Sequence, residues 1–254
     1  MLCKALDSVY SQILLPNEVI VVDDGSTDGT NLVKQKYPGI VYLKQANCGA
    51  ASAKNTGLKY AKSSWITFLD SDDIWKSSKL KSQIAFHENN QGILASYTDE
   101  YWVFNNKIIN KKSHQIKANK NSFLDNIANT LIGTSTVMIH RSVFDDIGSF
   151  DEELIVCEDY DLWLRILRKY QFGYIDKELI KKIAGHGDQL SFNTKMIDFY
   201  RIESLKKHLN SKYADEVKKA ILKRLNILLK GAKKYNNLEI ISYCNNLKIK
   251  LQKR

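Results

Sequence analysis

One apolar stretch of this sequence runs directly into a group of acidic side chains. Residues 65–69 read Trp-Ile-Thr-Phe-Leu, and Asp70, Asp72 and Asp73 follow them. Carboxylates crowded so closely repel one another unless a cation lies between them, and oxygen ligands suit hard divalent cations. The simpler interpretation is an acidic turn that caps the next helix, since Asp is common in turns and at helix N-caps. Taken alone, this stretch leaves both interpretations open.

A second acidic strand end favours a ligand site. The apolar residues 19–22 lead into Asp23 and Asp24, and Gly25 and Gly29 follow. Ligands of open α/β sheets bind beyond the carboxyl ends of the strands, so two acidic strand ends predict one shared crevice. Glycine permits the tight backbone turn that such a loop requires.

The order of the apolar segments predicts an α/β fold with a mixed, mostly parallel sheet that helices flank on both faces. The first strands are expected at 19–22, 40–44 and 65–69, and the helices around them at 4–12, 29–36 and 51–61. Farther along, we expect a helix over 74–90, a strand region over 93–104, a hairpin and loop over 105–121, a strand over 133–140 and a short helix over 141–147.

The basic charge of the chain is concentrated near its C-terminal end. The net charge is +10, and residues 195–254 carry 16 basic and 5 acidic side chains. Apolar residues recur there every three or four positions, which predicts two or three amphipathic helices. We therefore divide the chain into an α/β domain over 1–190 and a basic helical extension over 191–254. Such helices suit an anionic membrane surface or an acidic partner, and a solvated lysine-rich face is the alternative.

Composition excludes several other classes of protein. The chain is 44% hydrophobic and has two prolines, which argues against disorder. Its apolar runs are much shorter than the ~20 residues that cross a bilayer, and no signal-peptide pattern precedes them. The four cysteines are widely separated, which indicates neither a disulfide framework nor a zinc site. We expect a cytoplasmic protein, with peripheral association at the inner face of the membrane as the second possibility.

Three segments taken together resemble the nucleotide-sugar motifs of family 2 glycosyltransferases, which have the GT-A fold. They are residues 21–30 (VVDDGSTDGT), 47–57 (NCGAASAKNTG) and 68–73 (FLDSDD). Their order and spacing also match, and the resemblance extends over roughly residues 2–190. It implies inverting, metal-dependent transfer of a sugar from a nucleoside-diphosphate sugar, foremost a UDP-sugar. The implied acceptor is a hydroxyl of a glycan or lipid-linked molecule in cell-surface polysaccharide assembly.

The resemblance also implies roles for individual side chains. Asp70 and Asp72 form the D-x-D element, with Asp72 as the direct ligand of Mn²⁺ or Mg²⁺ and Asp70 at the ribose or the metal. Asp24 matches the carboxylate that binds the nucleotide base, and Asp23 beside it is a weaker candidate. Lys54 stands where the family often has arginine, so it keeps the charge and loses the two-pronged geometry.

Two further acidic positions are read in the same way. Asp73 could join the metal ligands or cap a helix that begins at Ile74. The segment 157–165 resembles the Glu-Asp motif that supplies the catalytic base, so Asp159 is the expected base and Glu158 would orient the base or the acceptor. A helix N-terminus stabilises an ionised carboxylate, although the same description fits an ordinary helix cap.

The last motif places a histidine between two glycines at residues 185–187. By resemblance, His186 would complete the metal and diphosphate site, with Asp188 and Gln189 as weaker candidates. A lone histidine is more often structural than functional. With one attacking hydroxyl, one base and no second carboxylate placed as a nucleophile, the anomeric configuration would invert.

Members of this family usually begin with an apolar strand ahead of the helix that opens this sequence. Either the true start lies upstream of Met1 or the protein is truncated, and a missing inner strand would leave unpaired backbone groups at the edge of its neighbour. Two other functions remain open: a noncatalytic remnant of the GT-A fold that binds nucleotide weakly or not at all, and a sugar nucleotidyltransferase. The latter generally opens with a Gly-rich phosphate loop, which is not seen here. Nucleic-acid binding is disfavoured because the basic tail contains no recognisable nucleic-acid-binding module.

Overall fold

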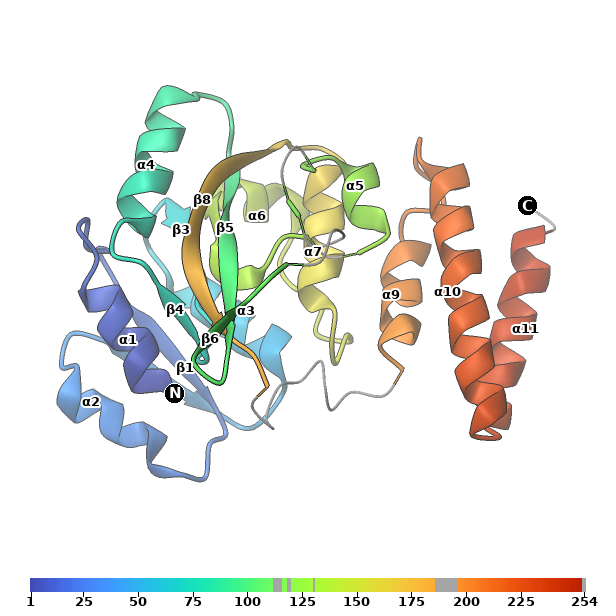
Figure 1. Ribbon diagram of the computed structural model, residues 1–254, viewed down its shortest axis with the longest axis horizontal. Coiled ribbons are helices and arrows are strands. Elements are labelled where there is room, and N and C mark those ends of the chain that lie inside the picture. The colour runs from blue at the N-terminus through green and yellow to red at the C-terminus, as the bar shows by residue number, and fades with distance from the viewer. Residues whose placement is uncertain (112–115, 118–119, 130, 186–195, 253–254) are drawn as a thin grey trace.

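The computed structural model describes residues 1–111, 116–117, 120–129, 131–185 and 196–252. One curved sheet separates two groups of helices, and three further helices extend the molecule toward its C-terminus (Figure 1). Helices α1 (Leu2–Tyr10) and α4 (Lys79–Asn89) share one apolar cluster on one face of the sheet. Helices α6 (Arg141–Ile147) and α7 (Glu158–Leu167) belong to the larger core on the other face. The α/β architecture expected from the sequence is confirmed.

The larger sheet has the strand order β3-β7-β5-β8-β4, with β6 paired to β5. In the described part of the chain, β5 and β8 are its one parallel pair, and the other neighbours are antiparallel. The expected mixed sheet is thus confirmed, although most described ladders of this sheet are antiparallel: β5–β6 is a local hairpin, and the others join strands far apart in sequence. The strands are β3 (Trp65–Ile66), β4 (Asp73–Trp75), β5 (Ala95–Phe104), β6 (Lys107–Ile109), β7 (Val137–His140) and β8 (Phe172–Ile183).

A separate parallel pair, β1 (Ile20–Asp24) and β2 (Val41–Gln45), forms the smaller sheet. Around it lie η1 (Gly29–Leu32), α2 (Val33–Lys36) and α3 (Ala50–Tyr60). Among the described residues, β2 is the strand partner of β1. A cavity of about 810 Å³ lies beside β1, lined by residues 19–22 on one side and 65–71 on the other.

Two elements near the acidic turn differ from the sequence-based expectation. The helix predicted over 74–90 begins only at Lys79, because β4 pairs with β8 in the preceding segment. The capping role considered for Asp73 is therefore wrong: this residue opens a strand, and Ser78 is the N-cap of α4. The strand predicted over 133–140 begins as the 3-10 helix η3 (Thr134–Thr136) and continues as β7.

Helix α7 lies at the centre of the larger core. Its residues Tyr160, Leu162, Trp163 and Leu164 are at most 1% exposed, and most of its other side chains are buried as well. Phe172 at the start of β8 packs edge-on against Trp163. This packing fixes the position of the acidic N-terminus of α7, which opens on the opposite side toward α3.

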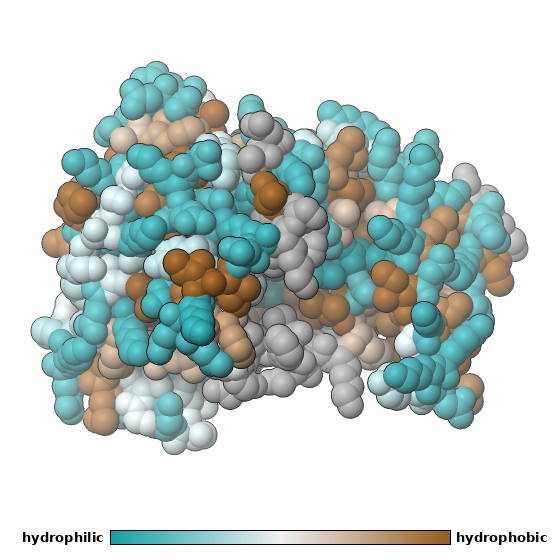
Figure 2. Space-filling view, viewed as in Figure 1, coloured by the Kyte–Doolittle hydropathy of each residue, from teal (hydrophilic) through white to brown (hydrophobic). Residues whose placement is uncertain are grey.

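The C-terminal helices share this core. They are α9 (Ile197–Lys206), α10 (Ala214–Lys234) and α11 (Leu238–Gln252), and the short α5 (Phe123–Ile127) lies nearby. Lys207 joins them to α7 by an ion pair of 2.7 Å with Asp161. Figure 2 shows hydrophilic and apolar side chains intermingled over their outer surface, without one continuous apolar face. None of the described helices is long and apolar enough to cross a membrane.

Candidate active site

The acidic turn between β3 and β4 brings three carboxylates together. One oxygen from each of Asp70, Asp72 and Asp73 lies within 4.8 Å of the others, and we call these residues the acid cluster. The backbone N–H of Asp70 donates to the hydroxyl of Ser135 at 3.0 Å, which fixes the turn to η3. Oxygen donors at this spacing fit one hard divalent cation.

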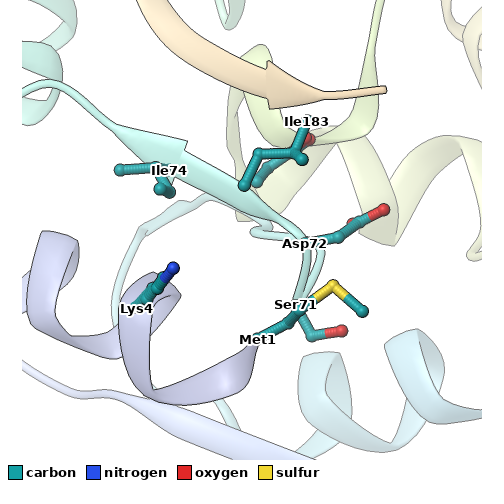
Figure 3. A pocket seen from close by; sticks show the side chains of 7 residues that line it. Met1, Lys4, Ser71, Asp72, Ile74 and Ile183 are labelled. Carbon is teal, nitrogen blue, oxygen red and sulfur yellow. The ribbon is translucent and has the colours of Figure 1, made fainter. Parts of the chain in front are cut away.

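The surroundings of the acid cluster are seen best at a small cavity next to it. In Figure 3, Ser71 and Asp72 lie on the turn, Met1 at the start of α1 is beside them, and Ile183 projects from the end of β8. The cavity has a volume of about 210 Å³. The turn is thus enclosed by elements from both ends of the described α/β region.

Asp73 is the most deeply buried member of the acid cluster. It is 3% exposed, and its Oδ2 lies 3.3 Å from the Nζ of Lys182. Burial raises the pKa of Asp73 to about 6, the ammonium of Lys182 opposes this shift, and the charges of Asp70 and Asp72 add to it. Asp73 therefore belongs both to the acid cluster and to an ion pair with Lys182.

A second group of charges lies beside the acid cluster, between α3 and α7. The Nζ of Lys54 is 2.6 Å from Glu158 Oε1, although 104 positions separate these residues in sequence. Burial would lower the pKa of Lys54, but the charges of Asp70, Glu158 and Asp159 outweigh it and hold the pKa above its usual value. Lys54 therefore connects the acid cluster with the start of α7.

Asp159 occupies the first turn of α7. Its Oδ1 accepts from the backbone N–H of Tyr160 at 2.6 Å, and its Oδ2 accepts from the Thr134 hydroxyl at 3.4 Å. Burial, reinforced by the charge of Glu158, raises the pKa of Asp159 to about 6, against the effect of Lys54. Burial therefore outweighs the lowering of the Asp159 pKa that the helix N-terminus was expected to cause. A pKa of about 6 still leaves most of this carboxylate ionised at neutral pH.

The loop after β1 holds its own carboxylates tightly. Asp24 accepts from the Gln45 side chain at 2.8 Å and from the backbone N–H groups of Cys48 and Gly49 at 2.9 and 2.8 Å. A Cβ at Gly25 would lie 2.8 Å from the backbone nitrogen of Asn47, and the φ angle of Gly25 is +83°, so this position requires glycine. Asp24 thereby ties the end of β1 to the start of α3.

Asp23 is also engaged by neighbouring donors. It is 3% exposed, and it accepts from the backbone N–H of Ser26 at 2.7 Å and from the hydroxyl of Tyr42. Burial would raise the pKa of Asp23, but the hydrogen bonds from Tyr42 and Ser26 outweigh it and lower the pKa. The side chain of Asp23 faces into the loop.

Helix α3 relates this loop to the charged groups farther on. Gly49 is the N-cap of α3 and contacts Asp24, whereas Lys54 lies five residues along the same helix. Five residues of α-helix span about 7.5 Å. The structure therefore brings Asp24, Lys54, Glu158, Asp159 and the acid cluster along one continuous path, whereas His186, Asp188 and Gln189 lie outside the described residues.

Sequence reasoning missed several residues that support this site. Thr134 and Ser135 contact Asp159 and Asp70, and the run of three hydroxyl residues at 134–136 inside an otherwise apolar segment was a usable signal. Lys182 lies opposite Asp73 across the β4–β8 ladder. No sequence signal identified Lys182, because β8 itself was not predicted.

Comparisons with known proteins identify the family of this chain. The model of the family described as glycosyl transferase family 2 matches residues 1–148. An uncharacterized glycosyltransferase of Rickettsia prowazekii is 31% identical over 215 residues, which are 80% of this chain and 65% of that protein. The Escherichia coli protein named UDP-Glc:alpha-D-GlcNAc-diphosphoundecaprenol beta-1,3-glucosyltransferase WfgD is 35% identical over 175 residues, 68% of this chain and 66% of that protein.

A solved structure supports the fold. The crystal structure of S. aureus TarS 1-349 in complex with UDP-GlcNAc has a TM-score of 0.69 and 22% identity, and the match covers 90% of this chain and 69% of that one. The chain spans 65% of the first two curated relatives and about 30% of the third. The family match covers more than half of the sequence, and the chain therefore belongs to glycosyltransferase family 2.

Proposed function

We propose that this chain transfers a sugar from a nucleoside-diphosphate sugar to a hydroxyl group, with inversion at the anomeric carbon and with the help of a divalent cation. One observation carries this proposal: Lys54 stands between the acid cluster and the carboxylates at the start of α7. Segments far apart in sequence thereby supply the charges that a leaving diphosphate and an attacking hydroxyl need.

The acid cluster is the proposed cation site. Asp72 and Asp70 would hold Mn²⁺ or Mg²⁺, since their carboxylate oxygens are hard ligands that lie close together. When bound, such an ion supplies positive charge that stabilises the departing diphosphate. His186, which we predicted from the sequence to complete the site, remains a proposal.

The donor would lie along α3, from the loop after β1 to the acid cluster. A carboxylate offers about four acceptor positions, and Asp24 uses three of them on Gln45, Cys48 and Gly49. The remaining position suits an N–H group of the nucleotide base. Lys54 would face the diphosphate, Asp70 the ribose, and Asp23 would support the loop from within.

Asp159 is the proposed catalytic base. It would accept the proton of the acceptor hydroxyl at a carboxylate oxygen, while Glu158 and Lys54 hold its orientation and charge. Its raised pKa makes it a stronger base than an ordinary aspartate and leaves it ionised at neutral pH. No second carboxylate is needed for a single displacement, which is why inversion is expected.

The finer assignments rest on the relatives. WfgD is named for UDP-Glc and a diphosphoundecaprenol-linked sugar, which favours a UDP-sugar donor and a glycan or lipid-linked acceptor here. We also propose that residues 1–190 form the α/β domain and residues 191–254 the helical extension. The basic helices of this extension would associate peripherally with an anionic membrane at its cytoplasmic face.

A donor screen tests this function directly. The full chain would be incubated with UDP-, GDP- and dTDP-sugars, Mn²⁺ and a lipid-linked glycan acceptor, and release of the nucleoside diphosphate would be measured. We expect release with a UDP-sugar. Asp159→Asn should stop release and leave the dissociation constant of the UDP-sugar unchanged within about threefold. Normal turnover by this variant would exclude Asp159 as the base.

A noncatalytic remnant that binds nucleotide weakly or not at all is the second candidate. The observation that bears on it is the cavity of about 810 Å³ between β1 and β3, which lies beside the strand that ends at Asp24. Calorimetric titration with UDP and Mn²⁺ separates the two functions. Absence of heat at millimolar UDP would favour the remnant. Saturable UDP binding without sugar transfer would instead mean that the chain binds the nucleotide but does not use the acceptor tested.

A further inference from the structure

Buried charges of alternating sign lead away from the acid cluster. Asp73 pairs with Lys182 at 3.3 Å, and Glu100 Oε2 pairs with Lys117 Nζ at 2.9 Å. The charge of Lys182 lowers the pKa of Glu100, so these two pairs are electrostatically joined. Asp73, Glu100 and Lys117 are at most 6% exposed. Buried charges are costly unless they are compensated, so each of these groups depends on its neighbours.

The backbone gives Lys182 this central position. In the β4–β8 ladder it lies directly opposite Asp73, and in the β5–β8 ladder it lies opposite Trp102. The indole N–H of Trp102 donates to Glu100 Oε1 at 3.1 Å. At Gly133, a Cβ would lie 2.9 Å from Glu100 Oε2 and 3.4 Å from Lys182 Cε. A larger residue there would therefore push the side chains of Glu100 and Lys182 out of place.

The charges around a bound cation show why this arrangement matters. Asp70 and Asp72 together balance one divalent ion, and a third carboxylate ligand would leave a net negative charge facing a diphosphate. Asp73 is close enough to become that third ligand. Its Oδ2 is buried, and its ion-pair partner among the described residues is the ammonium of Lys182.

We propose that Lys182 is a positioning residue that keeps Asp73 from binding the cation, so that only Asp70 and Asp72 do so and coordination positions stay open for diphosphate oxygens. This inference rests on the proposed function of the acid cluster. Asp73, the acid next to the D-x-D element, thus pairs with Lys182 of β8 and does not bind the metal. Glu100 also has a role, since it holds Lys182 from the other side.

Binding of Mn²⁺ to the full chain tests this inference without measuring turnover. Free Mn²⁺ would be quantified by electron paramagnetic resonance, with and without UDP. In Lys182→Met, the released Asp73 should tighten Mn²⁺ binding about tenfold without UDP, because ligand charge sets affinity at such sites. The enhancement of Mn²⁺ binding by UDP should fall by about tenfold as well.

Three further variants make the result specific. Lys182→Arg keeps the positive charge and should stay within about threefold of the unmodified chain. Lys181→Met changes the neighbouring lysine of β8, which lies opposite Ile74 instead of Asp73, and should do the same. The double variant Lys182→Met with Asp73→Asn removes the released carboxylate and should restore the original affinity.

The outcomes separate this inference from the function beneath it. If Asp72→Asn leaves Mn²⁺ binding intact, the proposed cation site itself is wrong. Suppose that Asp72→Asn abolishes Mn²⁺ binding and that a cooperative thermal unfolding transition shows Lys182→Met to be folded. If Lys182→Met then binds Mn²⁺ with unchanged affinity, the proposed role of Lys182 is overturned. If Lys182→Met does not fold, Asp73→Asn alone decides: affinity within about threefold supports the inference, and a loss of tenfold or more makes Asp73 a ligand and overturns it.

Discussion

Two acidic strand ends look alike in this sequence, yet the structure uses them differently. At the end of β1, Asp23 and Asp24 are engaged by donors of the protein, most of them within residues 26–49. At the turn after β3, one oxygen from each of Asp70, Asp72 and Asp73 lies near the others, and Lys182 forms an ion pair with Asp73. The first end is therefore a structural clamp with limited spare capacity, and the second is a concentration of negative charge suited to a cation.

This difference teaches where acidic motifs can be interpreted from sequence. Asp23 accepts from the backbone N–H of Ser26 in the turn that follows it, whereas the donors to Asp24 lie at residues 45–49, where β2 ends and α3 begins. A carboxylate in a turn between two short strands meets few donors, so its partners must come from distant segments or from a ligand. Lys54, Lys182 and Ser135 are such distant partners.

The largest expected effect is a difference in turnover between a variant at the turn after β3 and a variant in the loop after β1. Asp72→Asn should lower metal-dependent turnover by ~100-fold or more, because it removes a charged ligand of the proposed cation. Asp28→Asn, in the loop after β1, is the matched control, since Asp28 caps η1 through Thr30 and should keep near-normal turnover. Steady-state assays at saturating Mn²⁺ measure both. Equal losses in the two variants would erase the distinction drawn between these ends.

The next effect concerns the base beside the second strand end. Because the pKa of Asp159 is about 6, kcat/KM should rise about tenfold per pH unit below this value and level off above it. A carboxyl whose folded pKa is raised favours folding in its protonated form. Its contribution to stability is therefore present at low pH and is lost as the pH rises from 3.8 toward 6.

Measuring kcat/KM and the free energy of urea unfolding over a series of pH values tests both predicted pH dependences. Asp159→Asn should remove the Asp159 contribution to the unfolding profile, since asparagine does not titrate. A kcat/KM profile that stays flat between about pH 5 and 7 would contradict the assignment of the base.

The smallest effect probes the clamp at the first strand end. Asp24→Asn keeps the size of the side chain but replaces an accepting oxygen with an N–H donor that faces the N–H groups of Cys48 or Gly49. We expect a loss of about 1–3 kcal/mol in the free energy of unfolding, measured with urea. Turnover should fall less than in Asp72→Asn. If stability stays the same and turnover collapses, Asp24 acts through the ligand alone and not as a structural clamp, and the contrast between the strand ends is wrong.

Much of the fold followed from local patterns. The helix over 141–147 and the hairpin after residue 104 were predicted, the latter stabilised by Asn105 and Asn106 with positive φ angles. The helix predicted to begin at Ile74 fails because β4 pairs with β8, about 100 residues away. Pairing over that distance leaves no local sequence pattern, so neither β8 nor the strand character of Asp73 could be predicted.

The sequence by itself determined that acidic residues follow two apolar strands, and it placed an acidic pair at the start of a helix, because alternation and charge are local properties of a chain. The tertiary structure decided which of these carboxylates are already satisfied, which are paired with lysines, and how burial raises the pKa of Asp73 and Asp159. The physical reason is that desolvation and charge pairing depend on which distant side chains come to lie within a few ångströms.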